Sequence, residues 1–204
     1  MIPEEALARL KEGNQRFLQN CPVEHDWLTR VKQTADGQYP FVSVLGCIDS
    51  RTSTELIFDL DIGDLFSIRV AGNIIDDDVL ASLEFACTQT DARLIVVMGH
   101  TRCGAVAGAC ADTRIEEGYL EQLLDKIRPA VKEARQKCGA DASEDVVRDE
   151  ISRINTLHSV ALIKEKSSII AGLCQKNEVI IAAALYDVKT GTVTFYDEDK
   201  AAFI

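Results

Sequence analysis

Residues 93–104, with the sequence RLIVVMGHTRCG, decide the fold of this chain. The run 93–99, apolar after Arg93, has the length of a strand, and a continuous apolar stretch of this kind is typical of a parallel sheet covered on both faces. His100 and Cys103 follow the run directly, at the point where the strand leads into a helix. Two residue types that bind metals therefore lie at the carboxyl end of a buried strand.

Residues 41–51, FVSVLGCIDSR, repeat this arrangement earlier in the chain. The run 41–46 predicts a second buried strand, which leads into Cys47, Asp49 and Arg51. Residues two apart in an extended chain point to the same side, so these three side chains can share one face. Open parallel sheets bind ligands at the carboxyl ends of strands, where the strand order reverses. If the two strands are neighbours, the two groups of residues face each other.

The rest of the chain alternates predicted helices and strands, so the fold class is α/β. We expect a single domain over residues 1–204, with a mainly parallel sheet of four parallel strands plus an antiparallel edge, covered by helices. Helical segments are predicted within 1–36 and over 54–60, 76–90 and 116–174 (broken near 139–141), and further strands over 65–70, 179–186 and 192–196. A turn at residues 189–191 makes the last two strands a hairpin.

Composition argues against several classes of partner. The chain has 204 residues and a net charge of −11, which disfavours nucleic acid because little positive charge is left for phosphates. No apolar run approaches the roughly 20 residues that cross a bilayer, so no membrane partner is expected. Seven scattered cysteines make a poor disulfide framework and favour a reducing, cytoplasmic location, and residues 1–5 do not resemble the start of a signal peptide.

Cys47, His100 and Cys103 together predict a zinc site with one Zn²⁺ per chain. Two thiolates and one imidazole suit this metal, and three protein ligands leave a fourth position open, as catalytic zinc sites do. The alternative is that these cysteines are packed thiols, the usual role of a cysteine inside a cell. We expect that ordinary role, or that of an ordinary histidine, for Cys21, Cys87, Cys110, Cys138, Cys174, His25 and His158.

Asp49 and Arg51 form either a surface ion pair of little consequence or a part of the site. Arg51 has the planar group that holds a carboxylate through two hydrogen bonds. Held in this way, Asp49 can accept a hydrogen bond from a nucleophile on the zinc and orient it. Cys103, near the start of a helix, is expected to ionise easily.

The motifs C-x-D-x-R (47–51) and H-x-x-C-G (100–104) resemble those of the β-class carbonic anhydrases of bacteria and plants, and residues 63–73, 82–86 and 186–191 are similar to that family too. The resemblance implies a zinc enzyme that interconverts carbon dioxide and bicarbonate plus a proton through a hydroxide on the zinc. It implies Cys47, His100 and Cys103 as ligands, with Asp49 and Arg51 as catalytic residues. It also implies homodimers in which residues 1–36 wrap around the partner and the sites lie at the interface, and it leaves a tetramer open.

The substrate site follows from the same resemblance. It implies that the Gly104 N–H and the Gln38 side chain bind a substrate oxygen, and that Phe66 and Phe85 line an apolar pocket. Phe85 stands where some plant-type relatives have tyrosine. Two rival functions stay open: hydrolysis of carbonyl sulfide or carbon disulfide at the same zinc, and a non-catalytic zinc- or bicarbonate-binding module in which Asp49 completes a closed site.

Overall fold

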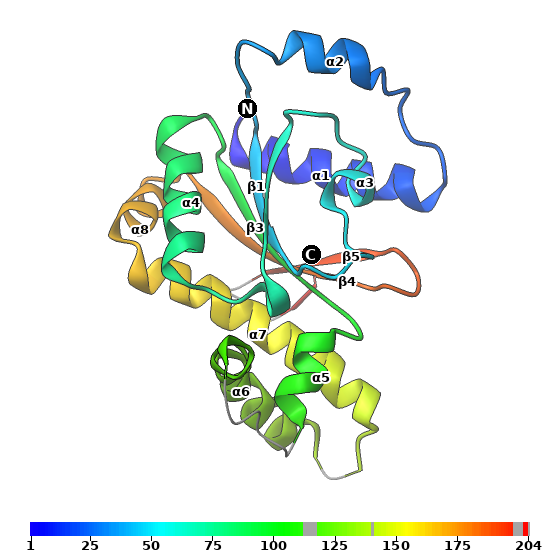
Figure 1. Cartoon of the computed structure of the whole chain (residues 1–204), viewed down its shortest axis with the longest axis vertical. Helices are drawn as coiled ribbons and strands as arrows, with labels where there is room; N and C mark the ends of the chain where they lie inside the picture. Colours follow the sequence, from blue (N-terminus) through cyan, green and yellow to red (C-terminus); the bar gives the residue numbers. More distant parts are fainter. Residues whose placement is uncertain (112–117, 140, 198–201, 204) are drawn as a thin grey trace.

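A computed structural model describes residues 1–111, 118–139, 141–197 and 202–203 of the chain. Its centre is a six-stranded sheet in the order β2-β1-β3-β4-β5-β6 (Figure 1). The four neighbouring strands β2, β1, β3 and β4 are parallel to one another, β5 is antiparallel to β4, and β6 is antiparallel to β5. This confirms the predicted topology. The strands are β1 (Val42–Gly46), β2 (Leu65–Arg69), β3 (Leu94–His100), β4 (Ile180–Tyr186), β5 (Val193–Asp197) and the two-residue β6 (Ala202–Phe203), which the sequence did not suggest.

Helices cover both faces of the sheet because successive strand residues point to opposite sides. On one face, Val44 and Val96 pack with residues of α1 (Pro3–Leu18) and with residues in and just after α3 (Thr54–Ile57). On the other face, Leu45 and Val97 pack against the helices α4 (Asp77–Gln89), α7 (Glu144–Lys166) and α8 (Ser168–Gln175). These continuous apolar strands are buried on both sides, as their sequences predict.

A third cluster lies beyond the carboxyl ends of β1 and β3. It joins α5 (Gly104–Cys110), α6 (Tyr119–Cys138) and the first half of α7, and it includes Cys47 and Cys103. In Figure 1 these helices extend the molecule past the sheet. The two cysteines therefore lie between the sheet and a helical wall.

The long helical segment predicted over 116–174 contains three helices. Ser143 and Ser167 each begin one, because their hydroxyls accept hydrogen bonds from Val146 N at 3.4 Å and Ile170 N at 3.1 Å. The break at Ser167 was not expected, and residues 116, 117 and 140 lie outside the described part of the chain. No helix in the described ranges is both long and apolar enough to cross a bilayer.

The second helix of the N-terminal segment, α2 (Trp27–Gln33), buries none of its residues. Its apolar side chains Trp27, Leu28 and Val31 are 58%, 76% and 49% exposed. Arg30 ties this helix to the residues before β2, donating to Asp64 at 2.9 Å and to the Ile62 carbonyl, and the Trp27 ring stacks on that of His25. Figure 1 shows α2 apart from the sheet. The helix is where periodicity predicts it, but its apolar face packs on no core cluster of the described residues.

Candidate metal centre

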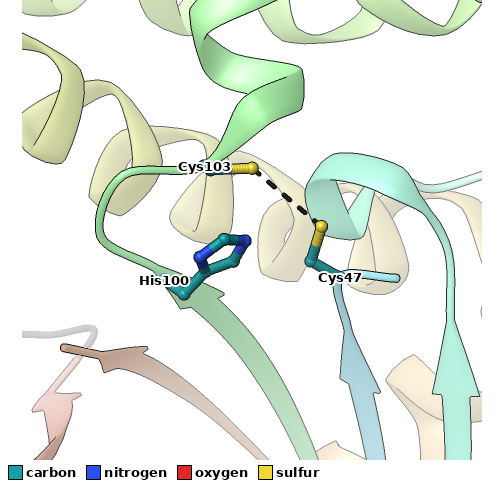
Figure 2. Close-up of side chains that lie close together, drawn as sticks. All are labelled: Cys47, His100 and Cys103. Carbon is teal, nitrogen blue, oxygen red and sulfur yellow. Dashed lines mark hydrogen bonds between the residues drawn. The ribbon is translucent and has the colours of Figure 1, made fainter. Parts of the chain in front are cut away.

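Cys47, His100 and Cys103 meet at the carboxyl ends of two neighbouring strands. Because β1 and β3 pair in parallel with Gly46 opposite Met98, Cys47 and His100 leave the sheet at nearly the same level. Cys103 lies just before α5. Their ligand atoms all lie within 4.8 Å of one another, and the two sulfur atoms are 4.0 Å apart (Figure 2). No other group of this kind occurs among residues 1–111, 118–139, 141–197 and 202–203.

The His100 ring is set for metal binding by its own hydrogen bond. Its Nδ1 lies 2.9 Å from the Thr101 carbonyl oxygen, so Nδ1 carries the hydrogen and Nε2 keeps a free lone pair. Nε2 is buried and has no hydrogen-bond partner among the described residues. Figure 2 shows the imidazole pointing toward the space between the two sulfur atoms. An orphaned buried nitrogen is costly, and a metal ion in that space would satisfy it.

The two thiols share a single negative charge. The pKa of Cys47 falls to about 4, chiefly because its sulfur accepts a hydrogen bond from Cys103; against the opposing effect of burial, His100 and the Gly72 amide lower it further. The pKa of Cys103 is raised because its proton is held by Cys47 and because it is buried. The expectation that Cys103 ionises easily is therefore wrong for the metal-free chain. A second thiolate requires a cation between the sulfurs, which fits a soft divalent metal.

Asp49 is held beside this cluster by Arg51. Arg51 Nε and Nη2 donate to the two carboxylate oxygens at 2.9 and 2.8 Å, and the Arg51 amide donates to Oδ1 at 3.0 Å. These hydrogen bonds lower the pKa of Asp49 to about 2. Its Oδ2 lies 4.0 Å from His100 Nε2. The predicted pair is thus formed, and it offers an ionised acceptor next to the ligands without joining them.

The backbone that carries Cys47 and Asp49 is clamped from β2. Arg69 Nε donates to the Cys47 carbonyl at 3.0 Å and Arg69 Nη2 to the Asp49 carbonyl at 2.6 Å. The Thr52 hydroxyl donates to the same Asp49 carbonyl at 2.8 Å. Nothing in the sequence marks Arg69 or Thr52 as a site residue, because an arginine at the end of an edge strand is usually a solvated side chain.

The two-residue turn between His100 and Cys103 is held just as firmly. The Thr101 amide donates to the Tyr186 carbonyl at 2.9 Å, and the Arg102 amide donates to the Asp149 carboxylate at 3.2 Å. Arg102 has a φ of 55°, a left-handed conformation that needs such support in a residue other than glycine. The neighbouring strand β4 and helix α7 therefore fix the spacing of the two ligands.

A cavity of about 420 Å³ opens at this cluster. Cys47 and Asp49 provide its polar part, and its remaining wall is Ile48, Ala71, Gly104, Ala105, Gly108, Ala111, Leu120 and Leu124. Gly104 is the first residue of α5, so its N–H has no partner within the helix. A mostly apolar cavity with one carboxylate suits a small uncharged molecule.

Gln38, Phe66 and Phe85 do not line this cavity in their own chain. Phe66 pairs with Ser43, four residues before Cys47, which places it about 13 Å back along the strand. Gln38 is exposed and precedes β1, at the end opposite to Cys47. Phe85 is 54% exposed on α4 and lies edge-on to Phe66, with ring centroids 6.4 Å apart. Their substrate role stays a prediction.

None of the residues expected to be ordinary belongs to the group of three ligands. Cys87 is buried, and burial raises its pKa to about 11. His25 lies 3.0 Å from a carboxylate oxygen of Asp59 and His158 lies 2.8 Å from one of Glu133. No disulfide joins any of the seven cysteines, all of which lie in the described part of the chain.

Known proteins are similar to this chain over most of its length. The family described as "Carbonic anhydrase" matches residues 42–193, from β1 to the start of β5. "Carbonic anhydrase 2" of Mycobacterium tuberculosis is 34% identical over 96% of this chain and 93% of its own length. A carbonic anhydrase of Mycolicibacterium smegmatis is 33% identical over 94% and 92%. The crystal structure of the β-carbonic anhydrase CafA of Aspergillus fumigatus aligns with a TM-score of 0.77 and 27% identity, covering 98% of this chain and 91% of that one.

Proposed function

The chain belongs to the β-class carbonic anhydrases, and from this we propose that it holds one zinc ion through Cys47, His100 and Cys103 and interconverts carbon dioxide and bicarbonate. One observation carries the proposal. The three ligand atoms converge within 4.8 Å beside an apolar cavity, and Asp49 is kept off the ligand group by Arg51. This leaves the cavity side of the site open to substrate.

Zinc, when bound, supplies Lewis-acid chemistry that makes hydroxide available near neutral pH, a role for which carbonic anhydrases are themselves the general example. The residues of the chain supply the rest. The Asp49 carboxylate accepts a hydrogen bond from the attacking oxygen and so turns a lone pair of that oxygen toward the substrate. Arg51 keeps that carboxylate ionised and oriented. The Gly104 N–H donates to the substrate oxygen on which negative charge develops.

Metal analysis combined with stopped-flow carbon dioxide hydration tests the proposal. We expect about one zinc per chain, together with hydration activity that disappears when a chelator removes the metal and returns with added zinc. A protein that carries zinc but does not hydrate carbon dioxide would instead fit the non-catalytic binding module. Release of hydrogen sulfide from carbonyl sulfide or carbon disulfide, without carbon dioxide hydration, would favour the sulfur substrates.

A second copy of the chain, in our proposal, completes each site with its Gln38, Phe66 and Phe85. These residues are exposed or half-exposed and lie outside the cavity of their own chain. Phe66 is on β2, an edge strand that leaves backbone groups free to meet a neighbour. The exposed apolar face of α2 is a further surface that a partner would cover. Together they favour a homodimer in which the N-terminal helices grip the partner.

Mixing two inactive variants tests this arrangement. Cys47→Ser removes a metal ligand and keeps Gln38, whereas Gln38→Ala keeps the metal ligands and should lose activity about a hundredfold. Random reassociation of the two should restore about a quarter of the wild-type sites, because half of the dimers then contain one complete site. The control mixture, Cys47→Ser with His100→Ala, should stay inactive since all metal ligands come from one chain. Failure of the first mixture to recover activity would contradict a role for Gln38 across the interface.

A further inference from the structure

The amide of Gly72 makes a hydrogen bond to one of the candidate metal ligands. Gly72 N lies 3.3 Å from Cys47 Sγ, in the short turn η1 (Ala71–Asn73) that follows β2. Its φ of 68° is left-handed, and a Cβ at this position would lie 2.6 Å from Ile127 Cδ1. Only glycine fits this conformation and this space, so the amide can approach the sulfur closely.

Helix α7 holds this turn with side chains from one of its faces. Asn155 Nδ2 donates to the Gly72 carbonyl at 2.7 Å, and the Ser159 hydroxyl donates to the next carbonyl, that of Asn73, at 2.9 Å. Asn155 is buried, with only 3% of its surface exposed. Asn155 therefore binds the carbonyl of the residue whose own N–H faces Cys47, while Ser159 binds the carbonyl one residue farther along.

We propose that Asn155 is a positioning residue for the metal centre, acting through Gly72 on Cys47. The side-chain amide of Asn155 binds the Gly72 carbonyl and so holds the turn in which the Gly72 N–H is directed at the Cys47 sulfur. A hydrogen bond to a ligating thiolate reduces the charge that the sulfur donates to a metal, and such outer partners orient the ligand itself. This inference rests on the proposed metal site and adds a residue that lies 83 positions from Gly72 along the chain.

A purely structural role for Asn155 predicts something different. Its amide would then only satisfy a buried carbonyl, and removing it would lower stability without changing the electronic state of Cys47. Ser159 provides the matched comparison, because it makes the same kind of bond from the same helix to the adjacent residue.

Cobalt(II) binding to the 204-residue chain separates the two roles. We expect Asn155→Ala to weaken cobalt affinity about tenfold to a hundredfold in chelator competition and to shift the sulfur-to-cobalt charge-transfer band to lower energy. Ser159→Ala should lower the melting temperature but leave the charge-transfer band and the cobalt affinity as they are in the wild type. If Asn155→Ala does not fold, Asn155→Ser, which keeps a shorter donor, should show the same shift in smaller measure.

The same measurements state what would overturn the inference. If wild type binds cobalt through sulfur and both Asn155 variants keep its band and affinity, the positioning role is wrong while the metal site stands. Equal shifts in Asn155→Ala and Ser159→Ala would also overturn it, since the effect would then be a general loosening of the turn. If wild type shows no sulfur-to-cobalt band, the proposed metal site itself fails.

Discussion

His100→Ala should give a folded chain that retains no zinc and does not raise the rate of carbon dioxide hydration above that of the uncatalysed reaction. The imidazole is the only nitrogen ligand in the cluster, and its Nε2 has no other hydrogen-bond partner among the described residues. Without it, two sulfurs 4.0 Å apart remain, and two ligands do not hold zinc against exchange with solvent. The metal content of the purified variant and its stopped-flow hydration rate check this result.

His158→Ala is the control for this prediction. His158 lies on α7, exposed, and contacts Glu133 rather than the cluster, so this variant should keep full zinc and full activity. Circular dichroism of both variants verifies folding. A His100→Ala protein with one zinc per chain would show that His100 is not a required zinc ligand.

Asp49→Ala should keep its zinc and lose carbon dioxide hydration by about a hundredfold to a thousandfold. Asp49 is outside the group of three ligand atoms and is paired with Arg51, so metal binding does not depend on it. The variant lacks the acceptor that orients the attacking oxygen. Metal analysis and steady-state hydration kinetics on the same preparation measure the two effects separately.

The chain contains a second Asp-x-Arg pair that serves as the control. Arg93 Nη2 lies 3.2 Å from Asp91 Oδ1 at the surface, where such a pair contributes little. Asp91→Ala should therefore leave zinc content and activity unchanged. Loss of zinc in Asp49→Ala would make Asp49 a ligand, and undiminished hydration would remove its catalytic role.

The sheet and the metal cluster were predictable because their signals are local. Apart from Arg93 and Ser43, the runs 93–99 and 41–46 are apolar, a pattern typical of a strand buried on both faces. The adjacency of β1 and β3 brings His100 and Cys47 together from positions more than 50 residues apart. The helix boundaries were less predictable. The start of α8 depends on one serine cap within a continuous helical pattern.

Other features depend on contacts between distant segments. Periodicity predicted α2, but the positions of the flanking segments decide whether its apolar face packs on the core. In this structure that face is exposed. The family resemblance implied a shared site for Gln38 and Cys47, whereas within one chain β1 separates them by its whole length. The proximity of Cys47 to Cys103 likewise decides that the second thiol ionises much less readily than the first, because two buried like charges at this distance oppose each other.

By itself, then, the sequence determined the parallel sheet, the three candidate ligands and the Asp49–Arg51 pair. Each is written in short segments whose side-chain directions follow from the strand itself. Only the tertiary structure decided that Arg69 clamps the ligand backbone, that Asn155 supports Gly72, and that Gln38, Phe66 and Phe85 lie outside the cavity of their own chain. Those relations join segments far apart in the chain, and hydrogen bonds of this kind leave no periodicity or spacing by which a sequence reveals them.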